Sequence, residues 1–129
     1  MYPEFNNLIL KQASRIIHVV SDIAPSEQRD VFNQGTLKIW TGASEWTIWN
    51  DPTVNWAFRA IHDALHIKTG LGFTPDAEIE LGRIQANQYS GLLADIVYLE
   101  VAGQAEYFKR TGLFLENQRQ WILERLKGV

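Results

Sequence analysis

Two proline-led helix starts, on either side of a glycine-rich connection, constrain this fold most. In Asp51–Pro52 and again in Thr74–Pro75, a polar residue suited to the N-cap precedes a proline suited to the first helical position. Gly70 lies between them and favours a helix end. The pattern predicts one helix over residues 52–69 and a second over about 75–90.

Other segments are also predicted to be helical. Segment 4–23 places apolar side chains mostly three, four or seven residues apart, which is the period of an amphipathic helix. The strongly apolar segment 92–110 and segment 117–127 are predicted to form two further helices. Ser26 and the glycine at position 35 favour a short capped helix over residues 27–34.

Residues 36–49 have a different pattern. Two runs of alternating character flank the turn-like stretch 41–44, which predicts a β-hairpin. An isolated hairpin is marginally stable in water, so we expect it to pack on the helices through Trp40, Trp46 and Trp49. Together with Trp56, the same tryptophans are the candidate surface for a protein partner or for a second copy of the chain.

The predicted fold class is mainly α, or α+β with a minor β-hairpin. We expect a compact helical domain of about five helices, with one hairpin before the central helix. The 129 residues suit a single domain, 1–129, since domains cluster at about 100–150 residues.

The composition excludes several classes of function. The chain has no cysteine, so a metal would need histidine, carboxylate or amide ligands. The net charge of −3 argues against nucleic-acid binding. Neither a phosphate-binding loop nor a G-x-S-x-G elbow is present. No segment has the roughly 20 apolar residues of a membrane span, and the N-terminal segment lacks the uninterrupted apolar core of a secretory leader. We therefore expect a cytoplasmic protein that binds no membrane.

His62 and His66 are the candidate metal ligands. They lie four residues apart on the predicted helix 52–69, so their side chains share a face and can bind one ion. The zinc-protease motif H-E-x-x-H has this spacing, with a Glu after the first His as general base. Asp63 takes that position here and is the candidate base or orienting group.

Glu78 and Glu100 are the candidate carboxylates. Glu78 shares one face of helix 75–90 with Gln85 and is predicted to be the third metal ligand or a catalytic orienting group. Glu100 falls among apolar residues on the buried side of its helix. A carboxylate there needs a partner or a metal, so Glu100 is the reserve ligand.

Ordinary structural roles compete with both assignments. His62 and His66 also suit the edge of an apolar stripe, where histidines bond to backbone or carboxylate groups. Glu100 also suits a buried ion pair with Arg59 or Arg83.

The middle third of the chain resembles a family of phage-encoded proteins of uncharacterised function. The family pattern is an N-D pair, an F-R-A-x-H-D helix motif, a further His, Gly, Phe, a G-E pair and a later polar residue. The matching residues here are Asn50–Asp51, Phe58–Asp63, His66, Gly70, Phe73, Ala77–Glu78 and Gln85. The likeness is most specific over Phe58–Asp63.

The sequence departs from the family pattern at three positions. His66 comes one residue earlier, Ala77 replaces a glycine, and Gln85 replaces a histidine. The resemblance implies a viral or mobile-element origin, and hence the host cytoplasm. It also implies that one constellation is formed by His62, Asp63, His66 and Glu78.

Two functional hypotheses follow. The first is a phage-type protein with a His/carboxylate site for a divalent metal, zinc or manganese, that acts as a metal-dependent hydrolase. The second is a non-enzymatic binding or structural accessory protein in which His62 and His66 are ordinary structural residues.

Overall fold

The computed structural model describes residues 2–24, 32–33 and 35–128, and this part contains five continuous helical segments and a small sheet. The strands are β1 (His18–Ser21), β2 (Phe32–Asn33) and β3 (Thr36–Trp40). The helices are α1 (Pro3–Ala13), α3 (Pro52–Thr69), α4 (Pro75–Ala86), α5 (Gly91–Tyr98) continuing through η1 (Leu99–Gly103) into α6 (Gln104–Thr111), and α7 (Gln118–Lys127). The predicted fold class, mainly α with a minor β part, is confirmed.

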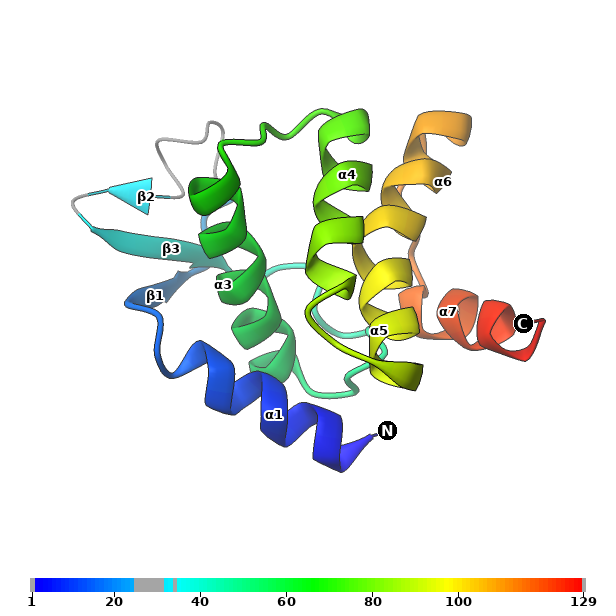
Figure 1. The fold of residues 1–129 in the computed structure, drawn as a ribbon, viewed down its shortest axis with the longest axis horizontal. Helices are drawn as coiled ribbons and strands as arrows, with labels where there is room; N and C mark the ends of the chain where they lie inside the picture. The colour runs from blue at the N-terminus through cyan, green and yellow to red at the C-terminus, as the bar shows by residue number, and fades with distance from the viewer. Residues whose placement is uncertain (1, 25–31, 34, 129) are drawn as a thin grey trace.

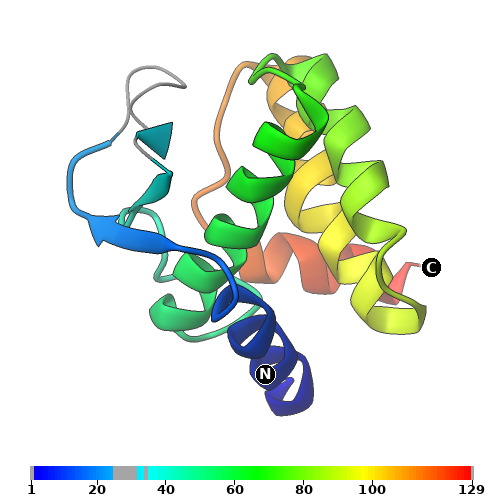
Figure 2. The ribbon, with the colours of Figure 1, turned by 60° about the vertical axis from the view of Figure 1, so that its left-hand side comes forward.

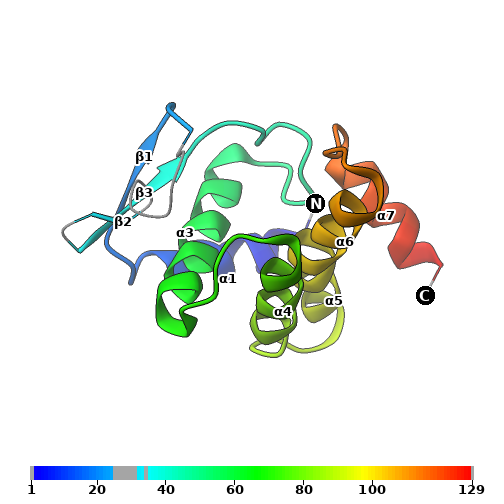
Figure 3. The same cartoon turned by 90° about the horizontal axis from the view of Figure 1, so that it is seen from above.

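The elements lie side by side in a row with α3 near its centre. Figure 1 shows the sheet, then α3, α4 and the α5–η1–α6 run, with α7 at the far end and α1 below α3. The view from above keeps this order (Figure 3). In the turned view of Figure 2, α7 lies across the lower end of the upright helices. Helix α3 is therefore covered by the sheet on one side and by α4 on the other.

The proline-led helix starts form as predicted. The Asp51 side chain accepts a hydrogen bond from the backbone N–H of Thr53, and the Thr74 side chain accepts one from Ala77. Helix α3 ends at Gly70, whose φ of +74° suits a residue without a side chain. These caps set the lengths of α3 and α4 and hence which of their side chains face each other.

The sheet corrects the helix predicted over residues 4–23. Helix α1 ends at Ala13, and β1 pairs in parallel with β3, with His18 opposite Leu37. The β-branched pair Val19–Val20 favours extended backbone, and pairing with β3 satisfies its peptide groups. The apolar spacing that indicated a helix here is thus overridden by tertiary pairing.

A hairpin precedes α3, but its strands differ from those predicted. Strand β2 is antiparallel to β3, with Asn33 opposite Thr36. The helix predicted over 27–34 is therefore wrong at Phe32–Asn33, and the rest of it lies outside the described residues.

The second strand predicted in residues 36–49 does not form. The carbonyl oxygens of Trp46 and Thr47 instead accept hydrogen bonds from the backbone and side chain of Arg119, each at 2.8 Å. Trp49 is buried in the main core, whereas Trp46 is 55% exposed. The partner surface expected on these tryptophans stays a prediction.

Apolar clusters lie on both sides of α3. Phe58 and Ile61 join the main core, which also contains Ile9, Ile48, Trp49, Ile96 and Ile122. Ala60 packs against Leu37 and Ile39 of β3. No helix in the described part of the chain is long and apolar enough to cross a membrane.

Gly82 brings α4 unusually close to the π-helical segment η1. A Cβ atom at this position would lie 2.6 Å from the backbone nitrogen of Ala102 and 2.7 Å from its Cβ. These are backbone and short side-chain atoms, so neither can move away cheaply. The close approach holds Glu78 and Gln85, on α4, in a fixed position relative to Glu100, on η1.

We predict that Gly82→Ala lowers the free energy of unfolding by about 2 kcal/mol, because the added methyl forces α4 away from η1. Chemical denaturation measures this value. Gly72→Ala is the control, since its Cβ would meet nothing within 4 Å, and it should change stability by less than about 0.5 kcal/mol. Equal effects of the two substitutions would contradict the predicted contact.

Candidate metal centre between α3 and α4

Two histidines of α3 and one glutamate of α4 converge on a single point. The Nε2 atoms of His62 and His66 are 3.0 Å apart. One carboxylate oxygen of Glu78 lies 3.1 Å from Nε2 of His62, and the other lies 2.5 Å from Nε2 of His66. The structure therefore brings together three of the residues predicted as metal ligands.

The other ring nitrogen of each histidine faces an oxygen atom. Nδ1 of His66 is 2.9 Å from the carbonyl oxygen of Leu71, and Nδ1 of His62 is 2.8 Å from Oε1 of Gln85. The carbonyl oxygen of Leu71 can only accept, so Nδ1 of His66 donates to it and Nε2 of the neutral ring carries no proton. With the amide oxygen of Gln85 directed at His62, the same tautomer places an unprotonated Nε2 of His62 at the convergence point.

The convergence point is thus surrounded by acceptors. Two imidazole lone pairs and a carboxylate repel one another at this distance unless a positive charge lies between them. A proton or a metal ion satisfies this requirement. Ligand atoms about 2.0–2.1 Å from a tetrahedral ion are roughly 3.3 Å apart. The separations of 3.0 and 3.1 Å at Nε2 of His62 are close to this value, whereas the 2.5 Å between His66 and Glu78 would have to widen to admit an ion.

The pKa values show how strongly these groups interact. Burial raises the pKa of Glu78, but the hydrogen bonds and charges that His62 and His66 supply in their protonated forms outweigh it and lower the pKa to about 2. Burial alone would lower the pKa of His62, but the bond to Glu78 and the charges of Glu78 and Asp63 raise it. The centre therefore favours an ionised carboxylate beside a positive charge.

Asp63 stands beside this centre. One ligand atom each from His62, Asp63 and His66 lie within 4.8 Å of one another, so these three residues could also hold a metal ion. Glu78 contacts both Nε2 atoms directly and is a second candidate for the third ligand. Burial raises the pKa of Asp63, although both histidines lower it.

The centre opens onto a cleft of about 380 Å³, here called the central cleft. His66 is buried beneath the ring of Phe73, with centroids 4.2 Å apart, and does not line this cleft. The side chains of His62 and Glu78, 14% and 24% exposed, do line it. An ion held by these residues would have one side directed toward the cleft.

Glu100 lies in the central cleft but is not part of the converging group. Its Oε2 accepts a hydrogen bond of 3.2 Å from Gln104, and its buried Oε1 has no hydrogen-bond partner among the described residues. Burial raises the pKa of Glu100 to about 7, although the backbone of Ile48 and the charge of Arg59 oppose this. The carboxyl of Glu100 thus lies in the central cleft and titrates near neutral pH. The role of Glu100 as a metal ligand stays a prediction.

Neither arginine considered as a partner binds Glu100 directly. Arg59 donates to the carbonyl oxygens of Trp40 and Gly42, at 2.7 and 2.5 Å, and acts on Glu100 only through its charge. Arg83 lies 3.8 Å from Glu80 on the exposed face of α4.

Sequence reasoning missed three groups that hold the centre. Gln85 bonds to His62 and is fully buried, the carbonyl oxygen of Leu71 fixes His66, and Phe73 covers that ring. In the family pattern Gln85 takes the place of a histidine. Its seven-residue spacing from Glu78 indicates the shared face, and in the structure it contacts Nδ1 of His62.

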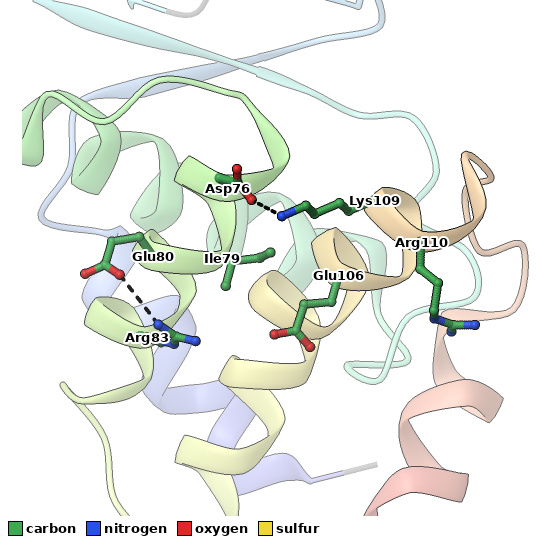
Figure 4. Close-up of a pocket in the computed structure, with 7 residues that line it drawn as sticks. All are labelled: Asp76, Ile79, Glu80, Arg83, Glu106, Lys109 and Arg110. Atoms are coloured by element: carbon green, nitrogen blue, oxygen red, sulfur yellow. Dashed lines mark hydrogen bonds and ion pairs between the residues drawn. The ribbon is translucent and has the colours of Figure 1, made fainter.

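A second hollow, of about 640 Å³, lies over the outer faces of α4 and α6 (Figure 4). Lys109 is 2.5 Å from Asp76 across these helices, and both side chains are more than half exposed. The ion pairs of this hollow, Lys109–Asp76 and Arg83–Glu80, are exposed to solvent, where ion pairs contribute little to stability. We therefore place the chemistry in the central cleft.

The chain matches no protein-family model, no curated protein and no solved structure. The resemblance to phage-encoded proteins, and the viral origin it implies, stay predictions.

We predict that Glu100→Gln stabilises the protein at pH 8 and not at pH 4. With its pKa raised to about 7 in the folded state, the carboxyl destabilises the fold as it ionises between pH 4.5 and 7. The isosteric amide removes that penalty, worth on the order of 2 kcal/mol at pH 8. Denaturation at the two pH values measures the difference.

The matched control is Glu116→Gln, at an exposed position. It should change stability little at either pH. A gain from Glu100→Gln that is the same at pH 4 and pH 8 would show that ionisation of Glu100 is not its cause.

Proposed function

We propose that this chain is a divalent-metal-dependent hydrolase whose ion is held by His62, His66 and Glu78. One observation carries the proposal: the two Nε2 atoms face each other at 3.0 Å, and Nδ1 of each ring lies within 2.9 Å of an oxygen atom. Hydrogen bonding from Nδ1 to an oxygen is the usual way in which proteins orient a histidine that binds a metal through Nε2.

The donor set supports zinc or manganese. Two imidazoles and one carboxylate form the three-ligand pattern of catalytic zinc sites, which leave a coordination position for water or substrate. Such an ion lowers the pKa of water and polarises a carbonyl group. His62 and Glu78 line the central cleft, so an ion that they hold would have its open position on the side of the cleft.

Two carboxyl groups of the chain could move the proton that hydrolysis requires. Asp63 lies beside the histidines, and Glu100 lines the cleft with a pKa of about 7. A group that titrates near neutral pH is suited to accept a proton and return it. We assign general-base chemistry to these residues and ligation to Glu78.

A non-enzymatic role is the competing function, and the raised pKa of His62 favours it. A protonated His62 would also supply the positive charge between the acceptors, and the cluster would then only join α3 to α4. Metal binding separates the two functions.

Protein purified without a histidine tag should bind one equivalent of zinc or manganese and become more stable. A metal concentration 100 times its Kd should add about 2.7 kcal/mol. Glu78→Gln, an isosteric change, should abolish most of this gain because it removes the anionic ligand. Titration calorimetry and thermal unfolding measure both effects.

His18→Ala is the control, because this third histidine lies on β1 and bonds to the carbonyl oxygen of Ile16. It should leave metal binding unchanged. Failure of zinc and manganese to bind would reject the ligand assignment. Binding of iron with oxygen consumption would contradict the hydrolytic assignment, since the same donors also suit iron(II).

Gln85→Leu should weaken metal binding by about 10- to 100-fold while the fold is kept, because His62 loses the acceptor that orients it. Gln88→Leu, at an exposed position near the end of α4, is the control and should have no effect. Unchanged affinity in Gln85→Leu would mean that the bond to His62 has no role in binding.

A further inference from the structure

Four phenylalanines line the central cleft, and one of them, Phe58, also belongs to the buried main core. We call Phe73, Phe108 and Phe114 the aromatic mouth. Phe73 is 46% exposed and Phe114 is 83% exposed. A ligand ring that covered these side chains would gain apolar burial and ring stacking together.

The rings form two walls. Phe73 packs on His66 with the ring planes inclined by 32°, so the first wall begins at a metal-ligand candidate. Phe108 of α6 stacks on Phe114 with centroids 4.6 Å apart and planes inclined by 23°. A ring in the aromatic mouth would therefore lie near a group held at the metal centre.

The polar lining of the central cleft is poorly suited to an anion. Among the lining residues in the described part of the chain, the one Lys or Arg side chain is Arg59, and it is bonded to backbone carbonyls. Glu100 adds a carboxyl group. Proteins often bind phosphate esters through cationic side chains that are free to contact the phosphate, such as an arginine that donates two parallel hydrogen bonds to it.

Side-chain amides supply the remaining polar contacts. Asn55, Gln104 and Gln118 line the central cleft. Asn55 already donates to Ser44 and Gln104 to Glu100, and each NH₂ group has a second N–H to donate. A neutral amide or ester has the same donors and acceptors, so these side chains can satisfy it without a charge. The volume of about 380 Å³ is at the small end of ligand pockets.

We infer that the substrate is a neutral amide or ester with an aromatic ring next to its carbonyl group. The ring occupies the aromatic mouth, and the carbonyl lies at the metal centre. This inference rests on the proposed function.

The oxygen of water bonds to the carbonyl carbon, the C–N or C–O bond breaks, and a proton from water passes to the leaving nitrogen or oxygen.

Hydroxamates test the inference because they bind a metal ion through their carbonyl oxygen and the neighbouring N–O oxygen. Zinc-loaded protein should bind benzohydroxamate at least about tenfold more tightly than acetohydroxamate. It should also prefer benzohydroxamate to phenylphosphonate, which keeps the ring but carries an anionic head group. Titration calorimetry gives the three dissociation constants.

Phe114→Ala should remove most of the preference for benzohydroxamate and leave acetohydroxamate binding unchanged. Leu113→Ala is the matched control, since Leu113 is also exposed, at 62%, and does not line the central cleft. Leu113→Ala should leave the dissociation constants of both hydroxamates unchanged.

The outcomes separate this inference from the proposed function. If zinc binds but the two hydroxamates bind equally, or if phenylphosphonate binds more tightly, the substrate class is wrong and the metal site stands. If zinc does not bind, the proposed function fails and the inference fails with it. Retention of the preference in Phe114→Ala would overturn the role of the aromatic mouth.

Discussion

The structure depends on one electrostatic constraint, the meeting of three acceptors between α3 and α4. The Nε2 atoms of His62 and His66 and the carboxylate of Glu78 lie within about hydrogen-bond distance of one another. The carbonyl oxygen of Leu71 and the amide of Gln85 lie against the Nδ1 atoms and orient both rings with Nε2 facing inward. A positive charge at this point completes the arrangement, and a divalent ion fits its donors.

The rest of the fold holds these acceptors in place. The caps at Asp51 and Thr74 determine where α3 and α4 begin, and the close approach at Gly82 fixes α4 against η1. The π-helical segment carries Glu100, and π-helical turns are often found at functional sites. A carboxyl with a pKa of about 7 thus lines the same cleft as the proposed ligands.

Local patterns predicted most of the helices and the residues at the centre. Proline, cap and glycine positions predicted α3 and α4, and the four-residue spacing of His62 and His66 predicted their shared face. Pairing between distant segments was not predictable in this way. Residues 18–21 follow a helical period yet pair with β3, and Trp46–Trp49 has the pattern of a strand yet bonds to Arg119. The role of Gln85 also depended on tertiary contact, because only the packing of α4 on α3 shows that it faces His62.

The coordination of zinc in protein without a histidine tag tests the central claim most directly. X-ray absorption spectroscopy of the loaded protein should show two imidazole nitrogens and carboxylate oxygen at about 2.0–2.2 Å, and the Glu78→Gln variant should lose this spectrum. A zinc ion surrounded by oxygen alone, without imidazole scattering, would contradict the account.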